Sequence, residues 1–186
     1  MKLKFNMLNA KKDPTWTLFL DRDGVINQRN FEGYITRVED FIFLPKVIEG
    51  LKLLAPQFSK IIVVTNQQGI GKGIMTEGDL DEIHNFMIKA LAVEGVYIDK
   101  VYFASNLRGE EPDRRKPNAA MALEAKSDFP DINFEHSVMV GDTASDLKFG
   151  MNLGMKTALI QSEEKVDIIP DFSVKNLKEL ANEIIR

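Results

Sequence analysis

The residues of this chain best suited to chemistry are acids that occur in pairs directly after apolar runs. Asp21 and Asp23 follow one run, two positions apart, and Asp142 and Asp146 follow another, four positions apart. Taken alone, the first pair is equally consistent with a surface turn, because Asp and the next residue, Gly24, favour turns. Helix capping by an acid explains one member of the second pair, but it accounts less well for both.

A hydroxyl, a lysine and a glycine-rich segment also follow apolar runs. Thr65 and Asn66 end the run 60–66, and the segment 67–73 that follows has the sequence QQGIGKG. Such a segment can supply donors for an anion, with a flexible loop as the alternative, and it lacks the Walker A pattern. Lys116 stands directly before a predicted helix, where backbone N–H groups favour an anion.

Together, the residues that follow these apolar runs predict one shared site. Carboxylates that converge on one crevice repel one another and raise each other's pKa, which a bound divalent cation relieves. Carboxylate oxygens, water and a substrate phosphate are the ligands that suit Mg²⁺. The residues therefore predict a Mg²⁺-dependent phosphoryl-transfer site with an aspartate nucleophile.

The elements that must position these residues alternate along the chain. Strands are predicted over residues 17–21, 60–66, 100–105, 137–142 and 156–160. Helices are predicted over residues 46–58, 76–94, 117–129, 144–153 and 176–185. Such alternation is typical of a three-layer, Rossmann-like α/β fold, in which helices cover both faces of a mainly parallel sheet and ligands bind beyond the carboxyl ends of the strands.

Composition limits the remaining possibilities. The 186 residues suit one domain, 1–186, with residues 1–15 as an N-terminal extension. The net charge of −4 disfavours nucleic acid as a partner, and the lack of cysteine excludes disulfides and thiol-based sites. No apolar run approaches the roughly 20 residues of a membrane span, and the N-terminus makes a poor signal peptide. We therefore expect a cytoplasmic protein without a membrane partner, and a monomer is favoured.

The motifs resemble those of the haloacid dehalogenase (HAD) superfamily of phosphatases. The resemblance covers about residues 17–160, and its four motifs occur here in order, as DRDGVIN from Asp21, Thr65, Lys116 and GDTASD from Gly141. Within the superfamily, the segments DRDGVIN, VVTNQQGIGKG and RKPNAAM look most like the D-glycero-D-manno-heptose 1,7-bisphosphate phosphatases and the histidinol-phosphate phosphatases. The resemblance implies a HAD-like fold.

The resemblance also implies a role for each motif residue. Asp21 would be the nucleophile that forms an aspartyl-phosphate, and Asp23 would protonate the leaving alcohol and then activate water. The carboxylates of Asp21 and Asp142, with the backbone carbonyl of Asp23, would ligate Mg²⁺. Thr65 and Lys116 would neutralise the transferring oxygens. Behind these groups, Asp146 would orient Lys116 or a metal-bound water.

Substrate contacts follow from the same resemblance. The segment 28–40 is too short for a separate cap domain, so it is expected to be a flap over an open site. Many relatives hold a structural zinc in a Cys/His loop, but residues 104–113 contain neither residue, so no zinc is predicted. His84 is expected to be a satisfied or surface histidine. The residues that match positions near the leaving group are Asn27, Arg29, Tyr34, Asn66, Gln67, Gln68 and Arg115.

Several functions remain open at this point. The leading hypothesis is a phosphatase of a small phosphorylated metabolite, with a heptose bisphosphate favoured and histidinol phosphate as the alternative. A polynucleotide 3′-phosphatase is a second possibility, because TNQQGIGKG also resembles those enzymes, but it would need a basic groove. A third hypothesis, from another class, is a non-catalytic binding module on the same fold.

Overall fold

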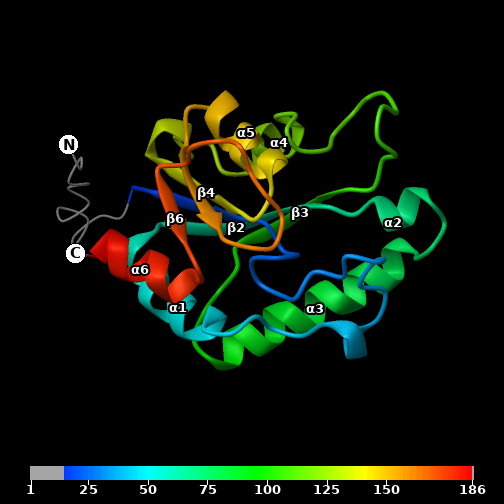
Figure 1. Cartoon of the computed structure of the whole chain (residues 1–186), viewed down its shortest axis with the longest axis horizontal. Coiled ribbons are helices and arrows are strands. Elements are labelled where there is room, and N and C mark those ends of the chain that lie inside the picture. Colours follow the sequence, from blue (N-terminus) through cyan, green and yellow to red (C-terminus); the bar gives the residue numbers. More distant parts are fainter. Residues whose placement is uncertain (1–14, 186) are drawn as a thin grey trace.

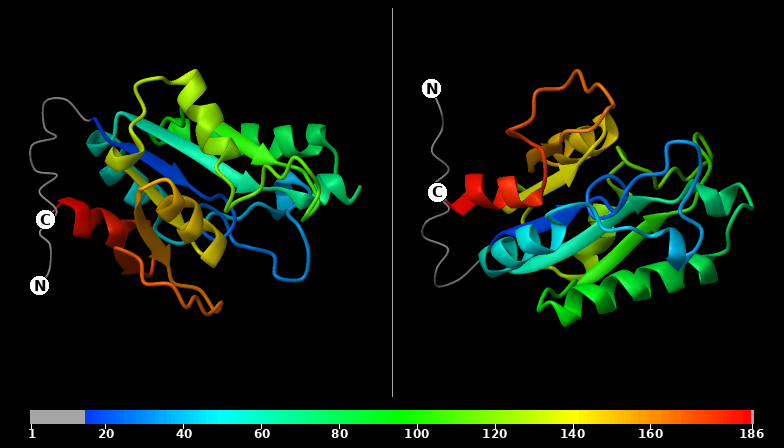
Figure 2. Two further views of the ribbon diagram at one scale, coloured as in Figure 1. Left: turned by 90° about the horizontal axis from the view of Figure 1, so that it is seen from above. Right: turned by 60° about the horizontal axis from the view of Figure 1, so that its bottom comes forward.

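Six parallel strands form one sheet in the computed structural model, which describes residues 15–185. The strand order is β3-β2-β1-β4-β5-β6, and the arrowheads lie toward one edge of the sheet (Figure 2). The strands are β1 (Thr17–Leu20), β2 (Lys60–Asn66), β3 (Lys100–Ala104), β4 (Ser137–Gly141), β5 (Lys156–Ile160) and β6 (Phe172–Val174). The predicted α/β fold class is thereby confirmed.

Helices cover both faces of the sheet (Figure 1). One face carries α1 (Val47–Leu54), α3 (Glu77–Val93) and α6 (Leu177–Ile185), and the other carries α4 (Ala120–Asp128) and α5 (Ala144–Asn152). Alternation along each strand separates two cores, because successive side chains point to opposite faces. Leu18 and Leu20 pack toward α1, α3 and α6, whereas Phe19 between them packs toward α4 and α5.

The strand order places the site. From β1 the chain adds β2 and β3 on one side, and then returns to add β4, β5 and β6 on the other. The loops after β1 and β4 therefore diverge, and such a switch point opens a crevice at the carboxyl ends of the strands. Asp21 and Asp142 are the first residues beyond β1 and β4, so both acids stand at this crevice.

Two predicted helix boundaries need correction, and one strand, β6, was not predicted. The helix expected from residue 117 begins at Ala120, because residues 115–118 form a turn in which the Asn118 N–H donates to the Arg115 carbonyl. The helix expected over 46–58 ends at Leu54 and continues as a 3-10 turn, Ala55–Gln57. The strand β6 is too short, at three residues, to leave a periodic signal.

The glycine-rich segment is also different from the expected anion loop. Residues Gln68–Gly71 form a short helix, α2. The N–H groups of Gly71, Lys72 and Gly73 donate to backbone carbonyls, the first of them to Ser105. A Cβ on Gly71 would lie 2.5 Å from that Ser105 oxygen, so glycine serves close packing here and the segment offers these donors to no anion.

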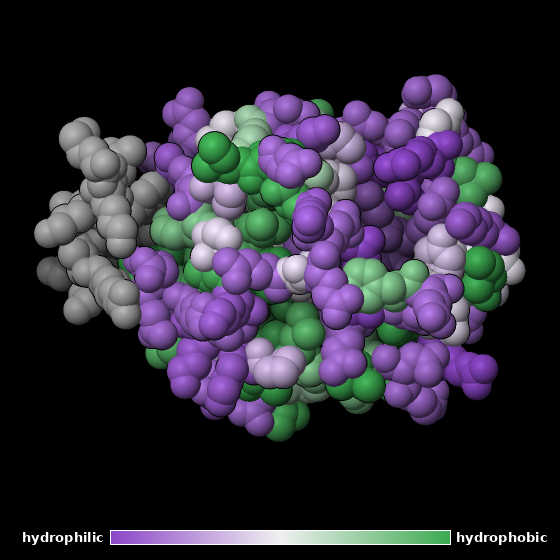
Figure 3. Space-filling model, in the orientation of Figure 1, coloured by the Kyte–Doolittle hydropathy of each residue, from purple (hydrophilic) through white to green (hydrophobic). Residues whose placement is uncertain are grey.

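The rest of the described chain adds two observations. On the face shown in Figure 3, hydrophilic residues predominate and apolar residues reach the surface in separate groups. Among residues 15–185, no helix combines the length and apolar character that a membrane crossing requires. The expected N-terminal extension lies, but for its last residue, outside the described residues.

Candidate active site

The site is organised around the ammonium group of Lys116, which is buried (4% exposed). Its Nζ lies 2.9 Å from Oδ1 of Asp21 and 2.6 Å from Oδ1 of Asp146, and it donates to the Val64 carbonyl at 2.8 Å. An ammonium has three donors, so three partners match its capacity. Burial lowers the pKa of Lys116, but the two carboxylates outweigh it and raise the pKa above its ordinary value.

The carboxylate of Asp21 has one oxygen held and one oxygen available. Oδ1 contacts Lys116 and accepts the backbone N–H of Arg22 at 2.7 Å, and Oδ2 has no hydrogen-bond partner among the described residues. Burial raises the pKa of Asp21 to about 8; Lys116 opposes this, and the neighbouring carboxylates add to it. Such a carboxylate is strained electrostatically until a cation reaches it.

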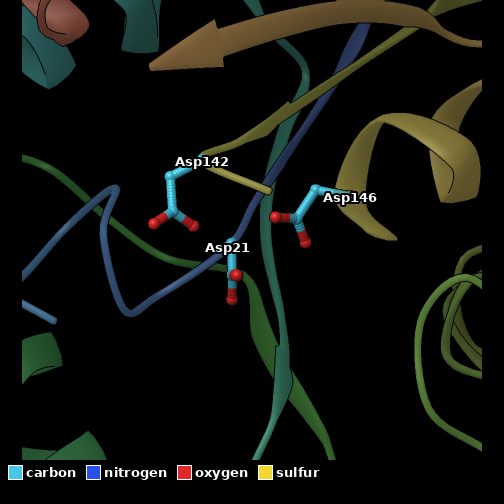
Figure 4. Close-up of side chains that lie close together, drawn as sticks. All are labelled: Asp21, Asp142 and Asp146. Atoms are coloured by element: carbon cyan, nitrogen blue, oxygen red, sulfur yellow. The ribbon is translucent and has the colours of Figure 1, made fainter. Parts of the chain in front are cut away.

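Three carboxylates lie close together at the switch point: those of Asp21, Asp142 and Asp146 (Figure 4). Each offers an oxygen within 4.8 Å of the others. Oδ1 of Asp142 is buried without a hydrogen-bond partner, and burial together with Asp146 raises the pKa of Asp142 to about 6, against the effect of Arg29. An all-oxygen, electron-rich set with an unpartnered buried oxygen fits a hard divalent cation such as Mg²⁺.

A glycine permits the close approach of the loops after β1 and β4. Gly24 has φ +84°, a conformation that other residues adopt only with strain. A Cβ built on Gly24 would lie 2.1 Å from Oδ2 of Asp142. Only a residue without a side chain fits between the turn after β1 and Asp142, which explains the glycine at position 24.

Asp146 has both functions that its position in the sequence left open. Oδ2 accepts the N–H and Oγ1 of Thr143 at 3.0 and 2.6 Å, which completes a capping box at the start of α5. Oδ1 meets the Lys116 ammonium. The carboxylate of Asp146 thus caps helix α5 and also positions the ammonium group of Lys116, which comes from the loop after β3.

Five donor contacts from three residues hold the carboxylate of Asp23, and three of the five come from Arg22. Arg22 donates from Nη2 to both of its oxygens at 2.9 Å, Asn27 donates to Oδ1 at 2.8 Å and Gln67 donates to Oδ2 at 2.9 Å. Burial raises the pKa of Asp23, but Arg22 and the amide donors outweigh it, and the pKa is below its ordinary value. The side chain is 24% exposed, toward the cavity.

The second and third motifs are tied together by Asn66. Its Oδ1 accepts the Lys116 N–H at 2.9 Å, and its Nδ2 donates to the Lys116 carbonyl at 3.2 Å. The backbone of Lys116 is therefore held by the Asn66 side chain, and not by the start of a helix, which begins only at Ala120. Thr65 is buried beside it and accepts a hydrogen bond from Gln67 at 2.9 Å.

A cavity of about 580 Å³ opens over these groups. Asp21, Asp23, Thr65, Lys116 and Asp142 all line it. So do five of the seven expected substrate contacts, which are Arg29, Tyr34, Asn66, Gln68 and Arg115. The other two, Asn27 and Gln67, lie beneath the lining and donate to Asp23.

The structure adds residues to this cavity beyond the expected substrate contacts. Arg108 and Lys72 line it together with Arg115, and Glu164 reaches it from the loop after β5. Nη1 of Arg29 lies 2.9 Å from Oε2 of Glu164 and 3.3 Å from Oδ2 of Asp142. No motif could indicate Arg108 or Glu164, because only the folding of two irregular loops brings them to the cavity.

Known proteins have similar sequences and a similar fold. A family profile described as "HAD-hyrolase-like" matches residues 113–180. The D-glycero-alpha-D-manno-heptose-1,7-bisphosphate 7-phosphatase of Campylobacter jejuni is 38% identical over 170 residues, which cover 90% of this chain and 95% of that protein. The D-glycero-beta-D-manno-heptose-1,7-bisphosphate 7-phosphatase of Helicobacter pylori is 34% identical over 165 residues, 88% and 93% of the two chains.

The chain belongs to the HAD superfamily of phosphatases. The resemblance noted in the sequence is therefore confirmed, and so is the prediction of an enzyme over that of a non-catalytic module. A solved HAD phosphatase, the D,D-heptose 1.7-bisphosphate phosphatase of B. bronchiseptica complexed with magnesium and phosphate, shares the fold with a TM-score of 0.82. It is 24% identical, and the match covers 91% of this chain and 98% of that one. HAD phosphatases generally depend on magnesium, in agreement with the acidic cluster here.

Proposed function

We propose that this HAD phosphatase hydrolyses one phosphate of a heptose 1,7-bisphosphate through an aspartyl-phosphate. The observation that carries the proposal is one cavity lined by Asp21, by Lys116 and by two guanidinium groups, those of Arg108 and Arg115, that form no ion pair within the described residues. The curated relatives that act on the alpha and the beta anomer of this sugar support the same substrate class.

The first step is a displacement at phosphorus. Oδ2 of Asp21 attacks, the bond from phosphorus to the ester oxygen breaks, and the leaving alkoxide takes a proton from the carboxyl group of Asp23. In the second step, Asp23 takes a proton from water, the water oxygen bonds to phosphorus, and Asp21 is released as a carboxylate. The sum is one ester and one water converted to an alcohol and inorganic phosphate.

The resting pKa of Asp23 suits the second step, in which it acts as a base. A substrate phosphate is a dianion, and like charge raises the pKa of a nearby carboxyl. The arrival of substrate therefore favours the protonated form of Asp23 that the first step needs. The three donors Arg22, Asn27 and Gln67 keep the group in place in both forms.

Charge neutralisation comes from both sides of the transferring group. Lys116, from the loop after β3, and Thr65, near the end of β2, line the cavity and would face the phosphoryl oxygens. Asp21 and Asp142, with the Asp23 carbonyl, would hold Mg²⁺, which when bound offsets the negative charge of the phosphoryl oxygens. Asp146 keeps Lys116 charged and directed toward Asp21.

The second phosphate of the substrate has a suitable partner in the cavity wall. Burial, and to a smaller extent the neighbouring Arg108 guanidinium, lower the pKa of Arg115, while Asp113 raises it. Within the described part of the chain neither guanidinium forms an ion pair, and Lys72 lines the same cavity. Two adjacent unpaired guanidinium groups match a phosphate dianion. They suit the cationic end of histidinol phosphate poorly.

A turnover screen tests the proposal. The substrates are both anomers of heptose 1,7-bisphosphate, heptose 7-phosphate, histidinol phosphate and a 3′-phosphorylated oligonucleotide, each with and without Mg²⁺. We expect Mg²⁺-dependent release of phosphate from a bisphosphate with the highest kcat/KM, and loss of this activity in D21N. A higher kcat/KM for histidinol phosphate or the oligonucleotide would overturn the substrate assignment.

A matched pair of arginine variants locates the second phosphate. R108Q is expected to raise KM for the bisphosphate by about tenfold, one charge-assisted contact, with little change for heptose 7-phosphate. Arg114 is the control, because it pairs with Glu124 at 2.7 Å and does not line the cavity. An equal increase of KM in R114Q would show a general effect of charge and count against the assignment of Arg108.

A further inference from the structure

The buried side chain of Arg22 connects the carboxyl group of Asp23 to helix α3. Arg22 is 0% exposed and is the largest fully buried side chain of the described residues. Nη2 and Nε face Asp23, at 2.9 Å and 3.3 Å from Oδ1. Nη1, on the other branch of the guanidinium, lies 3.3 Å from Nε2 of His84.

The chemistry of the two groups fixes the state of the histidine. A guanidinium has donors only, so the nitrogen that faces it must accept. His84 is therefore neutral, with its proton on Nδ1 and a lone pair on Nε2 directed at Arg22. Packing agrees, because the ring is 6% exposed and its centroid lies 6.3 Å from that of Phe103 on β3.

His84 is out of place for a residue that only fills space. The other four buried residues of α3 are Leu80, Ile83, Met87 and Leu91, all apolar, and His84 stands in the middle of their stripe. A buried polar ring costs free energy unless it is hydrogen-bonded, and Arg22 is the polar partner found for it. The polar contact is thus the feature that a simple core residue would lack.

We propose that His84 is a positioning residue for Asp23. It accepts a hydrogen bond from Nη1 of Arg22, and so holds the guanidinium in the orientation in which Nη2 and Nε donate to the Asp23 carboxylate. The proposal rests on the proposed acid and base roles of Asp23. Because the guanidinium is planar and rigid, Nη1 cannot turn away without moving Nη2 and Nε as well.

The effect of losing this contact follows from the same geometry. Without an acceptor, the Nη1 donors would be buried unpaired, and the fork would shift toward some other acceptor or water. Asn27 and Gln67 would still contact Asp23, so its placement would be loosened and not lost. We therefore expect a partial loss of proton transfer, with substrate binding retained.

A series of aryl phosphates measures proton transfer separately from binding. Dinitrophenolate leaves without help, whereas phenolate needs a proton from the acid, so kcat/KM for the two esters reports on Asp23. In H84M the ratio of kcat/KM for 2,4-dinitrophenyl phosphate to that for phenyl phosphate should rise by about fivefold, part of the 10²–10⁴ typical of acid catalysis. KM for phenyl phosphate should change little.

His84→Gln is the matched variant, because glutamine has the length of methionine but keeps an acceptor. We expect its ratio to stay near that of the wild type. A ratio that rises equally in both variants would overturn the proposal, since ring packing would then be the cause. A wild-type ratio in H84M would also overturn it.

D23N separates the failure of this inference from the failure of the proposed function. If D23N raises the ratio and H84M does not, Asp23 acts as proposed and His84 does not position it. If D23N leaves the ratio unchanged, the acid role of Asp23 fails, and with it this inference. Should H84M not fold, R22K keeps the charge but removes the His84 contact together with the fork on Asp23, and a wild-type ratio in R22K would overturn the proposal.

Discussion

Single residues in this site have more than one structural duty. Lys116 forms ion pairs with two carboxylates and donates to one carbonyl, so its ammonium group has partners from three residues. Asp146 caps α5 with one oxygen and pairs with Lys116 through the other. The spacing of Asp142 and Asp146 indicated both duties as alternatives, and the structure shows that they coexist because a carboxylate has two oxygens.

Removing the charge of Asp146 should destabilise the fold. D146N leaves the buried Lys116 ammonium with one charged partner, so the free energy of unfolding should fall by about 3 kcal/mol, as for a broken buried pair. Urea denaturation measures it. Glu94→Gln is the control, because the Lys52–Glu94 pair is half-exposed and should contribute less than about 1 kcal/mol. Equal losses in the two variants would contradict the role given to Asp146.

At the scale of elements, the site depends on two turns that approach each other closely. The turn after β1 passes Asp142 at Gly24, and β4 ends at Gly141, where a Cβ would lie 2.0 Å from Cβ of Asp146. Helix α3 begins at a capping box formed by Thr76 and Asp79. Caps are local and can be predicted, but the approach of two turns needs the positions of both strands.

An alanine at Gly24 should impair the site beyond its backbone strain. G24A forces Asp142 to move, so we expect at least about a tenfold loss of kcat with 4-nitrophenyl phosphate. Gly95 is the matched control, because it has a similar φ of +79° with nothing within 4 Å of a built Cβ. G95A should cost about 1–2 kcal/mol of stability and little activity. Similar activity losses in both would show that strain alone matters.

At the scale of the whole molecule, packing of α3 against the sheet brings His84 into contact with Arg22, in the turn after β1. Burial, and then the Arg22 charge, lower the pKa of His84 to about 3, with Asp23 opposing them. The unfolded chain has an ordinary histidine, with a pKa of about 6.5. The folded state therefore binds fewer protons than the unfolded state between these two values, and stability falls as pH falls through this window.

The pH dependence of unfolding checks this. From pH 7 to pH 5 the free energy of unfolding of the wild type should fall more than that of H84Q, with a difference of at most about 1.4 kcal/mol per pH unit below 6.5. Urea denaturation at several pH values measures the difference. Parallel curves for the two proteins would mean that His84 is not held neutral.

The amino-acid sequence alone determined the alternation of elements, the fold class and the residues at the strand ends, because these follow from periodicity and motif spacing along the chain. Only the tertiary structure decided which acceptors the hydrogen-bond donors contact and which cations reach the cavity. It showed that the glycine-rich N–H groups bond to carbonyls, that Asn27 and Gln67 lie against Asp23, and that Arg108 reaches the cavity. The reason is physical: hydrogen bonds and buried charges depend on distances between segments far apart in the chain, and no local pattern encodes those distances.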